Sequence, residues 1–371
     1  MLRVFAKALH HLKYNQLSLT DVSLGTRATV CIGTVAAWAL LPTSVFASTD
    51  FPQQVQQSLL LQSSSGGKTY LVNIGGLLGE AANGHQQIWQ FDARTAQWQV
   101  AADLPNPARH SSRQFATGTV VNQHMFVLGG ITRSSSKDRL QLVKENFRYS
   151  PVNKGVSRLP DTPVTVAQAA AVAWQDRYVY LISGRTEDGL VNLVQVFDNF
   201  TQKWQQATPL PVATAGHSAV IHHDTLLVCG GVVMAAPSQP WSSTSQCWQG
   251  QLDSKQPLRI QWQTFTALPE SSYAGHASIS SWQNQPALLF TAGEGKVSLA
   301  ADAMTAGQQS DVGYLWLTHD KRWQGVSTTG TLRFGSTFVQ QNDTLYQLGG
   351  VDHADKSQSS FRKVEFSLLP K

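Results

Sequence analysis

The stretch at residues 125–130 reads MFVLGG, a short apolar strand that ends in two glycines. The same pattern, an apolar strand that closes on a pair of small residues, occurs six times along the chain. The copies are YLVNIGG (70–76), MFVLGG (125–130), VYLISG (179–184), LLVCGG (226–231), LLFTAG (288–293) and LYQLGG (345–350). Their final glycines are 54, 54, 47, 62 and 57 residues apart, so one supersecondary unit is repeated.

Each unit is predicted to contain four strands. An apolar strand and a polar turn precede each glycine pair, as in SAVIHHDTLLV (218–228), which is the pattern of a tight hairpin. A third strand and a tryptophan strand that closes on Leu-Pro follow, as in VFDNFTQKWQQATPLP (196–211). Six units of four strands predict a β-propeller.

The repeat resembles the kelch repeat, in which an aromatic residue and then a tryptophan follow the glycine pair. The resemblance covers residues 59–366 and implies an all-β, six-bladed kelch-type β-propeller, which we assign to residues 48–371. The second unit departs from the repeat, because SPVNKGVSRLP follows Tyr149 without a tryptophan. The sixth unit ends without a fourth strand, so the last blade is predicted to be incomplete, with residues 50–52 as a short segment that could help to close the ring.

Residues 1–47 have the pattern of a signal peptide. A basic leader precedes an apolar run, VCIGTVAAWALL (30–41), and Pro42 and the small residues of VFAS (45–48) follow it. The run is short for a bilayer span. We expect cleavage after Ala47, a periplasmic protein and no stable membrane insertion after cleavage, with an uncleaved anchor as the alternative.

The net charge does not indicate a nucleic-acid partner. The chain carries +5, but residues 1–47 hold four basic residues against Asp21, so about +2 remains for the rest. No Lys/Arg cluster in that part resembles a stripe that follows a phosphate backbone.

Removal of the signal leaves two cysteines, Cys229 and Cys247. Cys229 ends the second strand of the fourth unit and Cys247 opens the third, so antiparallel pairing places both at the same end of a hairpin. Export to an oxidising compartment favours a disulfide between them. The alternative is two buried free thiols on opposite faces, because a one-residue slip in register would separate the side chains.

In a propeller, the loops between blades and the loops after each second strand gather around the central channel. Arginines on such loops suit an anionic ligand through bidentate hydrogen bonds, or else brace loop carbonyls. Histidines there can bind a ligand or satisfy buried carbonyls, and no carboxylate or cysteine stands at metal-ligand spacing from them, so no metal site is predicted. The candidates are Arg109, Arg333, His217 and His276 between blades, and Arg185, Glu294 and Lys296 after the glycines.

Glu294 stands at the end of a strand in the stretch FTAGEGKV (290–297). A carboxylate beside Lys296 at the rim of the channel would be ionised and able to act as a general base. The alternative is a surface ion pair of little energetic value.

The signal, the repeat and these loops together resemble the bacterial N-acetylneuraminate epimerase family of periplasmic sialic acid mutarotases. The proposed base of that family is the glutamate of an Asn-Gly-Glu-Ala-Lys loop, which AGEGK (292–296) resembles; LRFG (332–335) and PAR (107–109) are similar to its arginine loops. One departure is that the family's glutamate lies in the fourth unit and Glu294 lies in the fifth.

Two functional hypotheses follow. In the first, the protein is a cofactor-independent mutarotase or epimerase for an acidic sugar, with Glu294 as base, His276 as a possible acid, and Arg109, Arg333, Arg185, Lys296 and His217 as substrate-binding residues. In the second, it is a non-catalytic module that binds a cell-envelope glycan, or a protein partner through long loops such as residues 234–246 and 300–310.

Overall fold

A computed structural model of the chain describes residues 50–79, 83–84, 86–105, 113–133, 140–234, 239–291, 293–295, 298–299, 308–333, 335–341, 344–351 and 358–369. These residues belong to the larger of two units of the chain, Phe46–Lys371. Their regular structure consists of strands alone, and none of them forms a helix that could cross a membrane.

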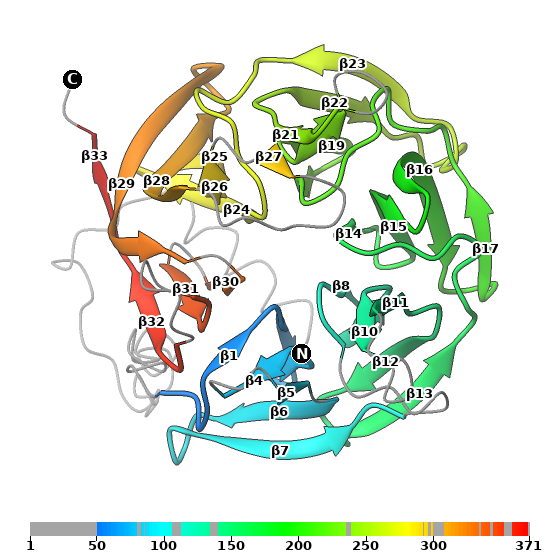
Figure 1. Ribbon diagram of the computed structural model, residues 1–371, viewed down its shortest axis with the longest axis vertical. Helices are drawn as coiled ribbons and strands as arrows, with labels where there is room; N and C mark the ends of the chain where they lie inside the picture. The colour runs from blue at the N-terminus through cyan, green and yellow to red at the C-terminus, as the bar shows by residue number, and fades with distance from the viewer. Residues whose placement is uncertain are drawn as a thin grey trace, which may run out of the picture. The chain divides into compact units, whose positions relative to one another are not determined.

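The strands form six small antiparallel sheets arranged as blades around a central channel (Figure 1). Five of the blades contain at least four strands, numbered here from the channel outward. Blade 1 comprises β2 (Leu59–Ser65), β3 (Lys68–Ile74), β6 (Gln87–Asp92) and β7 (Gln97–Asp103). Blade 2 comprises β8 (Thr117–Val121), β9 (His124–Leu128), β12 (Asn146–Ser150) and β13 (Gly155–Leu159). Blade 3 comprises β14 (Ala170–Trp174), β15 (Tyr178–Thr186), β16 (Gly189–Asp198) and β17 (Lys203–Gln206).

The second half of the ring contains blades 4 to 6. Blade 4 comprises β18 (Ser218–His222), β19 (Thr225–Cys229), β22 (Cys247–Gln251) and β23 (Gln261–Phe265). Blade 5 comprises β24 (Ala277–Trp282), β25 (Gln285–Thr291), β28 (Gln308–Leu317) and β29 (Arg322–Leu332). Blade 6 comprises three strands, β30 (Thr337–Gln341), β31 (Thr344–Leu348) and β32 (Phe361–Val364), so the prediction of six blades with an incomplete last one is confirmed.

The remaining strands are short and belong to loops. They are β1 (Val55–Gln56), β4 (Leu77–Leu78), β5 (Asn83–Gly84), β10 (Ile131–Arg133), β11 (Leu140–Leu142), β20 (Val232–Met234), β21 (Trp241–Ser243), β26 (Glu294–Gly295), β27 (Ser298–Leu299) and β33 (Phe366–Leu368). The last of these, β33, leaves blade 6 and pairs with β29 as a fifth strand of blade 5.

The ring is closed by the segment that precedes blade 1. The backbone nitrogens of Phe51 and Val55 donate hydrogen bonds to the carbonyls of Ser359 and Gln358 in blade 6, at 2.8 and 2.9 Å. The Phe51 side chain is 1% exposed and packs against Trp98 of blade 1, with 5.2 Å between ring centroids. The segment therefore joins the last blade to the first without supplying a fourth strand.

Tryptophans of the outermost strands tie blades 3, 4 and 5 to the blade before each of them. The indole nitrogens of Trp204, Trp262 and Trp323 donate to the backbone carbonyls of Pro160, Thr208 and Thr266, at 3.0 to 3.2 Å. Each acceptor lies at the outer end of the preceding blade, so this one contact both fills the wedge between two sheets and satisfies the indole nitrogen of a partly buried side chain.

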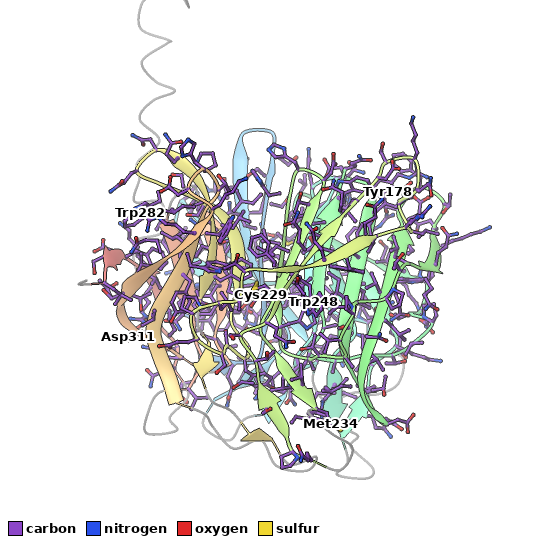
Figure 2. All side chains as sticks on the ribbon, turned by 90° about the horizontal axis from the view of Figure 1, so that it is seen from above. Tyr178, Cys229, Met234, Trp248, Trp282 and Asp311 are labelled. Carbon is purple, nitrogen blue, oxygen red and sulfur yellow. A yellow bond between two sulfur atoms is a disulfide. The ribbon has the colours of Figure 1, made fainter. Side chains whose placement is uncertain are left out.

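The two faces of the ring differ. The face with the turns between the first and second strands and between the third and fourth strands is called the hairpin face here. The face with the inter-blade loops and the loops after the glycine pairs is called the loop face. Figure 2 shows Trp282 and Tyr178 near one face and Met234, which follows a glycine pair, near the other.

The glycine pairs hold each blade to the next inter-blade loop. The backbone nitrogens of Gly76, Gly130 and Gly231 donate to carbonyls of that loop, at 2.7 to 3.1 Å, and Gly184 and Gly350 do the same at 2.8 Å. A β-carbon added to Gly129 would lie only 2.4 Å from the Val166 carbonyl oxygen. The first glycine is therefore required by this close approach as well as by its positive φ of 57°.

A second set of hydrogen bonds joins the inter-blade loops to one another at the loop end of the channel. In each loop, one residue has a positive φ. The backbone nitrogen of this residue donates a hydrogen bond to the backbone carbonyl of the equivalent residue in the preceding loop, and five such bonds are described, with nitrogen–oxygen distances of 2.6 to 3.4 Å. These loop-ring residues are Gln57, Phe115, Gln168, Gly216, Ala274 and Gly335.

Candidate functional site

The junction between blades 5 and 6 differs from the other junctions. Among the described residues, no hydrogen bond continues the glycine set from Gly293 to the loop before blade 6, and none continues the loop ring from Gly335 to Ala274. Gly293 lies close to the loop before its own blade, as the final glycines of other blades do, and an added β-carbon would overlap the Tyr273 carbonyl oxygen. The described residues of this corner therefore do not repeat the two sets of bonds, and Ala292 and Phe334, the neighbours of these glycines in the sequence, lie outside the described part of the structure.

The sequence of blade 5 explains this difference. In blade 4, Gly231 follows Cys229, the last paired residue of its strand, by two positions. In blade 5, Gly293 follows Phe290, which pairs with Ala277, by three positions. The hairpin of blade 5 is thus one residue longer before its glycine. Two further hydrogen bonds pair this extra residue, from Thr291 N to the His276 carbonyl (2.9 Å) and from His276 N to Thr291 Oγ1 (2.8 Å).

His276 and Glu294 therefore belong to the same corner of blade 5. His276 begins the innermost strand, and Glu294 follows the adjacent strand, with its backbone paired to Gln309 in β28. The side chain of Glu294 lies outside the described part of the structure, as do Lys296 and Arg109. The prediction that these three groups bind or transform a substrate stays a prediction.

The two histidines are not structurally equivalent, although both stand in the sequence Ala-Gly-His. His217 directly follows the loop-ring residue Gly216, whereas His276 follows Ala274 by two positions. His217 is 6% exposed, and burial lowers its pKa to about 4, with the backbone of Ile182 opposing the shift. His217 is thus a buried neutral side chain between blades 3 and 4, away from the blade 5 corner.

His276 lines the central cavity. Its imidazole packs against Phe338 of blade 6, with 5.6 Å between ring centroids, and burial lowers its pKa to about 4. The imidazole is therefore neutral at pH 7. The structure supports a role for it as a hydrogen-bonding group rather than as a charged imidazolium acid.

The two described arginines lie on different sides of the ring. Arg333 donates from Nη1 to the Ser360 hydroxyl at 2.5 Å and to the Gly349 carbonyl at 3.4 Å, which is the bracing role considered as its alternative. Arg185 lies in blade 3, opposite blade 6, where its backbone pairs with Ala167. Arg333 therefore belongs to the loop between blades 5 and 6, with side-chain partners in blade 6, whereas Arg185 belongs to blade 3.

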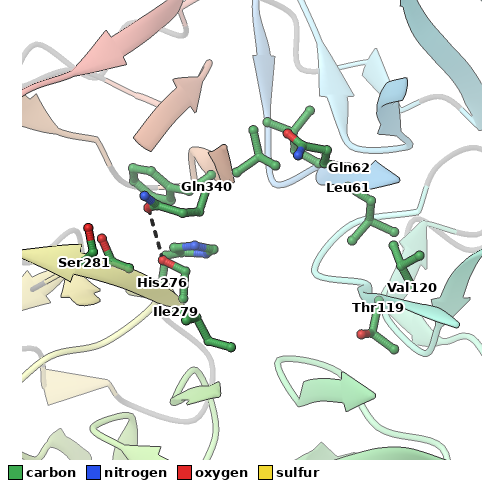
Figure 3. Close-up of a pocket in the computed structure, with 14 residues that line it drawn as sticks. Leu61, Gln62, Thr119, Val120, His276, Ile279, Ser281 and Gln340 are labelled. Carbon is green, nitrogen blue, oxygen red and sulfur yellow. Dashed lines mark hydrogen bonds between the residues drawn. The ribbon is translucent and has the colours of Figure 1, made fainter. Parts of the chain in front are cut away.

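The cavity occupies the channel between blades 1, 2, 5 and 6 and has a volume of about 720 Å³. Figure 3 shows His276 and Ile279 on one side of it, with Thr119 and Val120 on the other. Blades 5 and 6 meet at its edge through a hydrogen bond from Ser278 Oγ to Gln340 Oε1, at 3.3 Å. The described lining residues are Leu60, Leu61, Gln62, Gly118, Thr119, Val120, His276, Ser278, Ile279, Ser280, Ser281, Phe338, Val339 and Gln340.

Sequence reasoning identified His276 but missed the rest of this lining. The other lining residues belong to the innermost strands, where aliphatic, hydroxyl and amide side chains alternate as they do on many half-buried strands. Only the propeller assignment, combined with the strand register, could have found them. In the described part of the chain, no group of three His, Cys, Asp or Glu residues could hold a metal ion.

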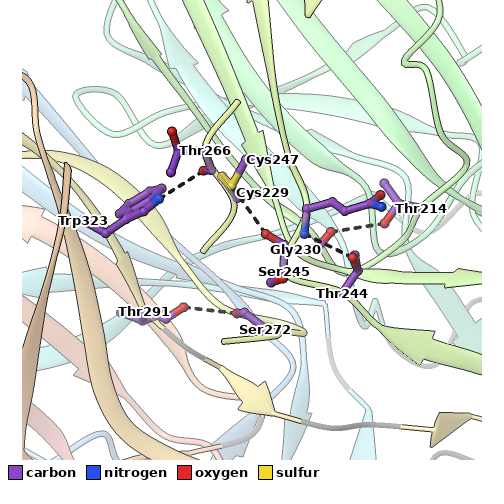
Figure 4. The surroundings of a disulfide bond; sticks show 11 residues. Thr214, Cys229, Gly230, Thr244, Ser245, Cys247, Thr266, Ser272, Thr291 and Trp323 are labelled. Atoms are coloured by element: carbon purple, nitrogen blue, oxygen red, sulfur yellow. Dashed lines mark hydrogen bonds between the residues drawn. A yellow bond between two sulfur atoms is a disulfide. The ribbon is translucent and has the colours of Figure 1, made fainter. Parts of the chain in front are cut away.

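The disulfide lies in blade 4, outside the cavity lining. Cys229 and Cys247 are directly opposite each other on β19 and β22, and their sulfur atoms are bonded (Figure 4). Both side chains are buried against residues of blade 5, including Phe290 and Trp316. The bond therefore stands at the base of the loop that contains β20 and β21.

The fold and this site define a kelch-type β-propeller with a ligand-sized central cavity. The family model of the Attractin/LZTR1 beta-propeller matches residues 65–359, and the chain belongs to this family. Curated relatives include Kelch-like protein 15 of Gallus gallus, which is 29% identical over 120 residues, or 32% of this chain. The matched region spans only 24% of the length of that relative.

Two comparisons extend over nearly the whole propeller. N-acetylneuraminate epimerase of Haemophilus influenzae (strain PittEE) is 21% identical over 384 aligned residues, which cover 88% of this chain and 96% of that protein. The solved structure of YjhT superposes with a TM-score of 0.64 at 18% identity, over 86% of this chain and 99% of that one. The chain is thus a β-propeller with distant similarity to both proteins, and the structural match concerns the fold.

Proposed function

We propose that this propeller exchanges the anomers of a small acidic sugar, without a cofactor, at the corner between blades 5 and 6. The observation that carries the proposal is that His276, with its neutral imidazole, and the Glu294 backbone lie at the same corner of blade 5. The similarity to N-acetylneuraminate epimerase along 88% of the chain supports the substrate class.

The chemistry needs two groups. A base takes the proton of the anomeric hydroxyl while the bond from the anomeric carbon to the ring oxygen breaks, water gives a proton to the ring oxygen, and the protonated base returns its proton to the hydroxide that is left. The open-chain carbonyl then rotates, and the reverse steps close the ring on its other face. Glu294 is the proposed base, and His276 donates a hydrogen bond to the ring oxygen as a neutral imidazole, a form that can polarise oxygen without carrying charge.

The arginines supply the proposed recognition of the carboxylate. Arg333 stands at the same junction, and Arg109 precedes blade 2 in the chain. Arg333 already donates to Ser360 and Gly349, so binding of the carboxylate would require its guanidinium to exchange present partners for the ligand. Signal cleavage and a periplasmic location complete the proposal, because the disulfide in blade 4 persists in an oxidising compartment.

The test is the rate of anomer exchange of N-acetylneuraminate, followed by proton NMR with and without the purified protein. Glu294→Gln preserves shape and should slow the catalysed exchange on the order of a hundredfold. Glu187→Gln, an exposed glutamate after the second strand of blade 3, is the matched control and should retain the parent rate. An exchange rate that micromolar protein leaves unchanged would reject the enzyme.

A non-catalytic glycan-binding role is the second candidate. Apart from His276 and Phe338, the described lining of the cavity contains hydroxyl, amide and aliphatic side chains and Gly118, and it has no Asp, Glu, Lys or Arg, which suits binding of an uncharged group. Binding of N-acetylneuraminate or an envelope glycan in calorimetry, without any effect on anomer exchange, would favour this role.

A further inference from the structure

The central cavity has the size and chemistry of a small-molecule site. Its volume of about 720 Å³ falls within the range of roughly 300–1,000 Å³ that is usual for such sites. Its lining combines an aliphatic part, with Leu61, Val120 and Ile279, and a polar part, with Gln62 and Thr119. A ligand that fits must present both apolar and hydrogen-bonding surface.

Ile279 shows that the aliphatic part is open. Its side chain is 52% exposed, although it belongs to the innermost strand of blade 5 and faces the channel (Figure 3). Exposed apolar surface inside a concavity is stabilised when a ligand covers it. The cavity therefore offers a contact surface for the C–H faces of a sugar ring or for the methyl group of an N-acyl substituent.

The polar part of the lining is neutral. Thr119 contributes a hydroxyl, Gln62 and Gln340 contribute amides, and His276 is uncharged at pH 7. Amides and hydroxyls both donate and accept hydrogen bonds, as the hydroxyls of a sugar do. A carboxylate placed among them would lose its hydration without gaining an opposite charge from the described lining.

The cavity extends along the channel away from the loop ring. Its lining begins at His276 and Phe338, near the loop-ring residues Ala274 and Gly335, and continues to Ser281 and Gln340, close to the turns of their hairpins. At the opposite end, five backbone hydrogen bonds join the six loop-ring residues. The lining therefore leads from the loop ring toward the hairpin face.

The geometry points to a second carbohydrate site, in which an uncharged N-acylated sugar enters from the hairpin face and binds between β2, β8, β24 and β30. This site binds its ligand whether or not the loop face exchanges the anomers of an acidic sugar. It selects against a carboxylate, whereas the loop-face site requires one, so the two ends of the channel recognise different parts of a glycan.

Calorimetric titration of the purified protein tests the site with two probes. N-acetyl-D-glucosamine is the neutral probe, and D-glucuronate is the probe in which the same ring type carries a carboxylate. We expect at least tenfold tighter binding of N-acetyl-D-glucosamine. Equal affinity for both probes, or the absence of any heat of binding at millimolar N-acetyl-D-glucosamine, overturns the inference.

Two variants locate the binding. Ile279→Trp fills the cavity from an already exposed position and should weaken N-acetyl-D-glucosamine at least tenfold, while Val152→Trp, at a 58% exposed position in the turn between β12 and β13, should bind like the parent. Thr119→Val removes one hydroxyl at nearly constant volume and should weaken binding several-fold. Thr119→Val keeps the site testable if Ile279→Trp disturbs folding. If both variants bind N-acetyl-D-glucosamine as tightly as the parent does, the sugar binds elsewhere.

Because anomer exchange is measured separately with N-acetylneuraminate, the two proposals fail separately. If N-acetyl-D-glucosamine does not bind, the anomer-exchange rates of the parent and of Glu294→Gln still test the enzyme. If the protein does not exchange anomers, the calorimetric titrations still test the neutral-sugar site.

Discussion

Gln168 donates a hydrogen bond from Nε2 to the Tyr273 hydroxyl, with 2.6 Å between the two atoms, and both side chains are buried. Gln168 belongs to the loop before blade 3 and Tyr273 to the loop before blade 5, so the bond crosses the loop before blade 4. Gly216 of that middle loop lies against the tyrosine ring, where an added β-carbon would overlap the ring carbons. The hydrogen bond and the packing of Gly216 thus fix the loops before blades 3, 4 and 5 relative to one another.

Tyr273→Phe should lower the free energy of unfolding by about 1–3 kcal/mol, because the buried amide of Gln168 loses its acceptor while the ring stays in place. The double variant Gln168→Leu/Tyr273→Phe should recover part of this loss, since neither partner is then left as an unpaired polar group. Urea unfolding of the three proteins measures both effects. Additive losses in the double variant would mean that the bond contributes nothing.

Ring closure depends on Phe51. Its buried ring packs against Trp89 and Trp98 at centroid distances of 5.1 and 5.2 Å, at the junction where blade 6 lacks a fourth strand. Phe51→Ala should cost about 3–5 kcal/mol of unfolding free energy, as large-to-small changes of buried aromatics do. Val152→Ala, at an exposed position, is the control and should change stability by less than about 0.5 kcal/mol. A similar small change in both would show that another segment closes the ring.

The sequence predicted the ring but not its irregular corner. Glycine pairs at regular spacing predict equivalent blades because each pair meets the next loop in the same way, as Gly76 and Arg113 do at 2.8 Å. The copy TAG at residues 291–293 looks like a conservative variant of that pattern, yet Gly293 follows the residue paired with the start of the innermost strand by three positions, whereas Gly231 follows the equivalent residue of blade 4 by two. A shift of one residue in register is invisible without the partner strand, and for the same reason the shared Ala-Gly-His sequence did not reveal that His217 and His276 occupy different positions.

The Arg177–Asp198 ion pair in blade 3 should make the free energy of unfolding decrease at acidic pH. Arg177 donates from Nε and Nη2 to the two carboxylate oxygens at 2.9 and 2.7 Å, and this bonding lowers the pKa of Asp198 to about 2. The folded pKa lies below the unfolded value of about 3.9, so the stabilisation is present above that value and is lost as pH falls toward 2. Asp198→Asn should therefore be less stable than the parent at pH 7, and the difference should shrink between pH 4 and pH 2 in urea unfolding. A difference that stays constant over this range contradicts the pairing.

The two buried histidines should add a second acid sensitivity at higher pH. Burial lowers the pKa of both His217 and His276 to about 4, below the unfolded value of about 6.5. The unfolded chain therefore binds up to two more protons than the folded chain near pH 5, and stability falls as pH falls from 6.5 to 4. His276→Gln and His217→Gln should each remove one proton from this uptake, measured from the slope of unfolding free energy against pH. Unchanged slopes in both variants would show that the imidazoles are protonated in the folded state.

Cys229 and Cys247 provide the last prediction. They pair directly on β19 and β22 and are 18 positions apart, so their disulfide closes the loop that carries β20 and β21. In the chain-entropy account, a loop of this length contributes on the order of 3 kcal/mol, because the bond restricts the unfolded chain. Thiol titration of the denatured, unreduced protein, after signal removal, should find no free thiol, and two free thiols per chain would rule the bond out. Reduction should lower the urea midpoint of the parent and leave Cys229→Ala/Cys247→Ala unaffected, because only the parent then has a bond to lose.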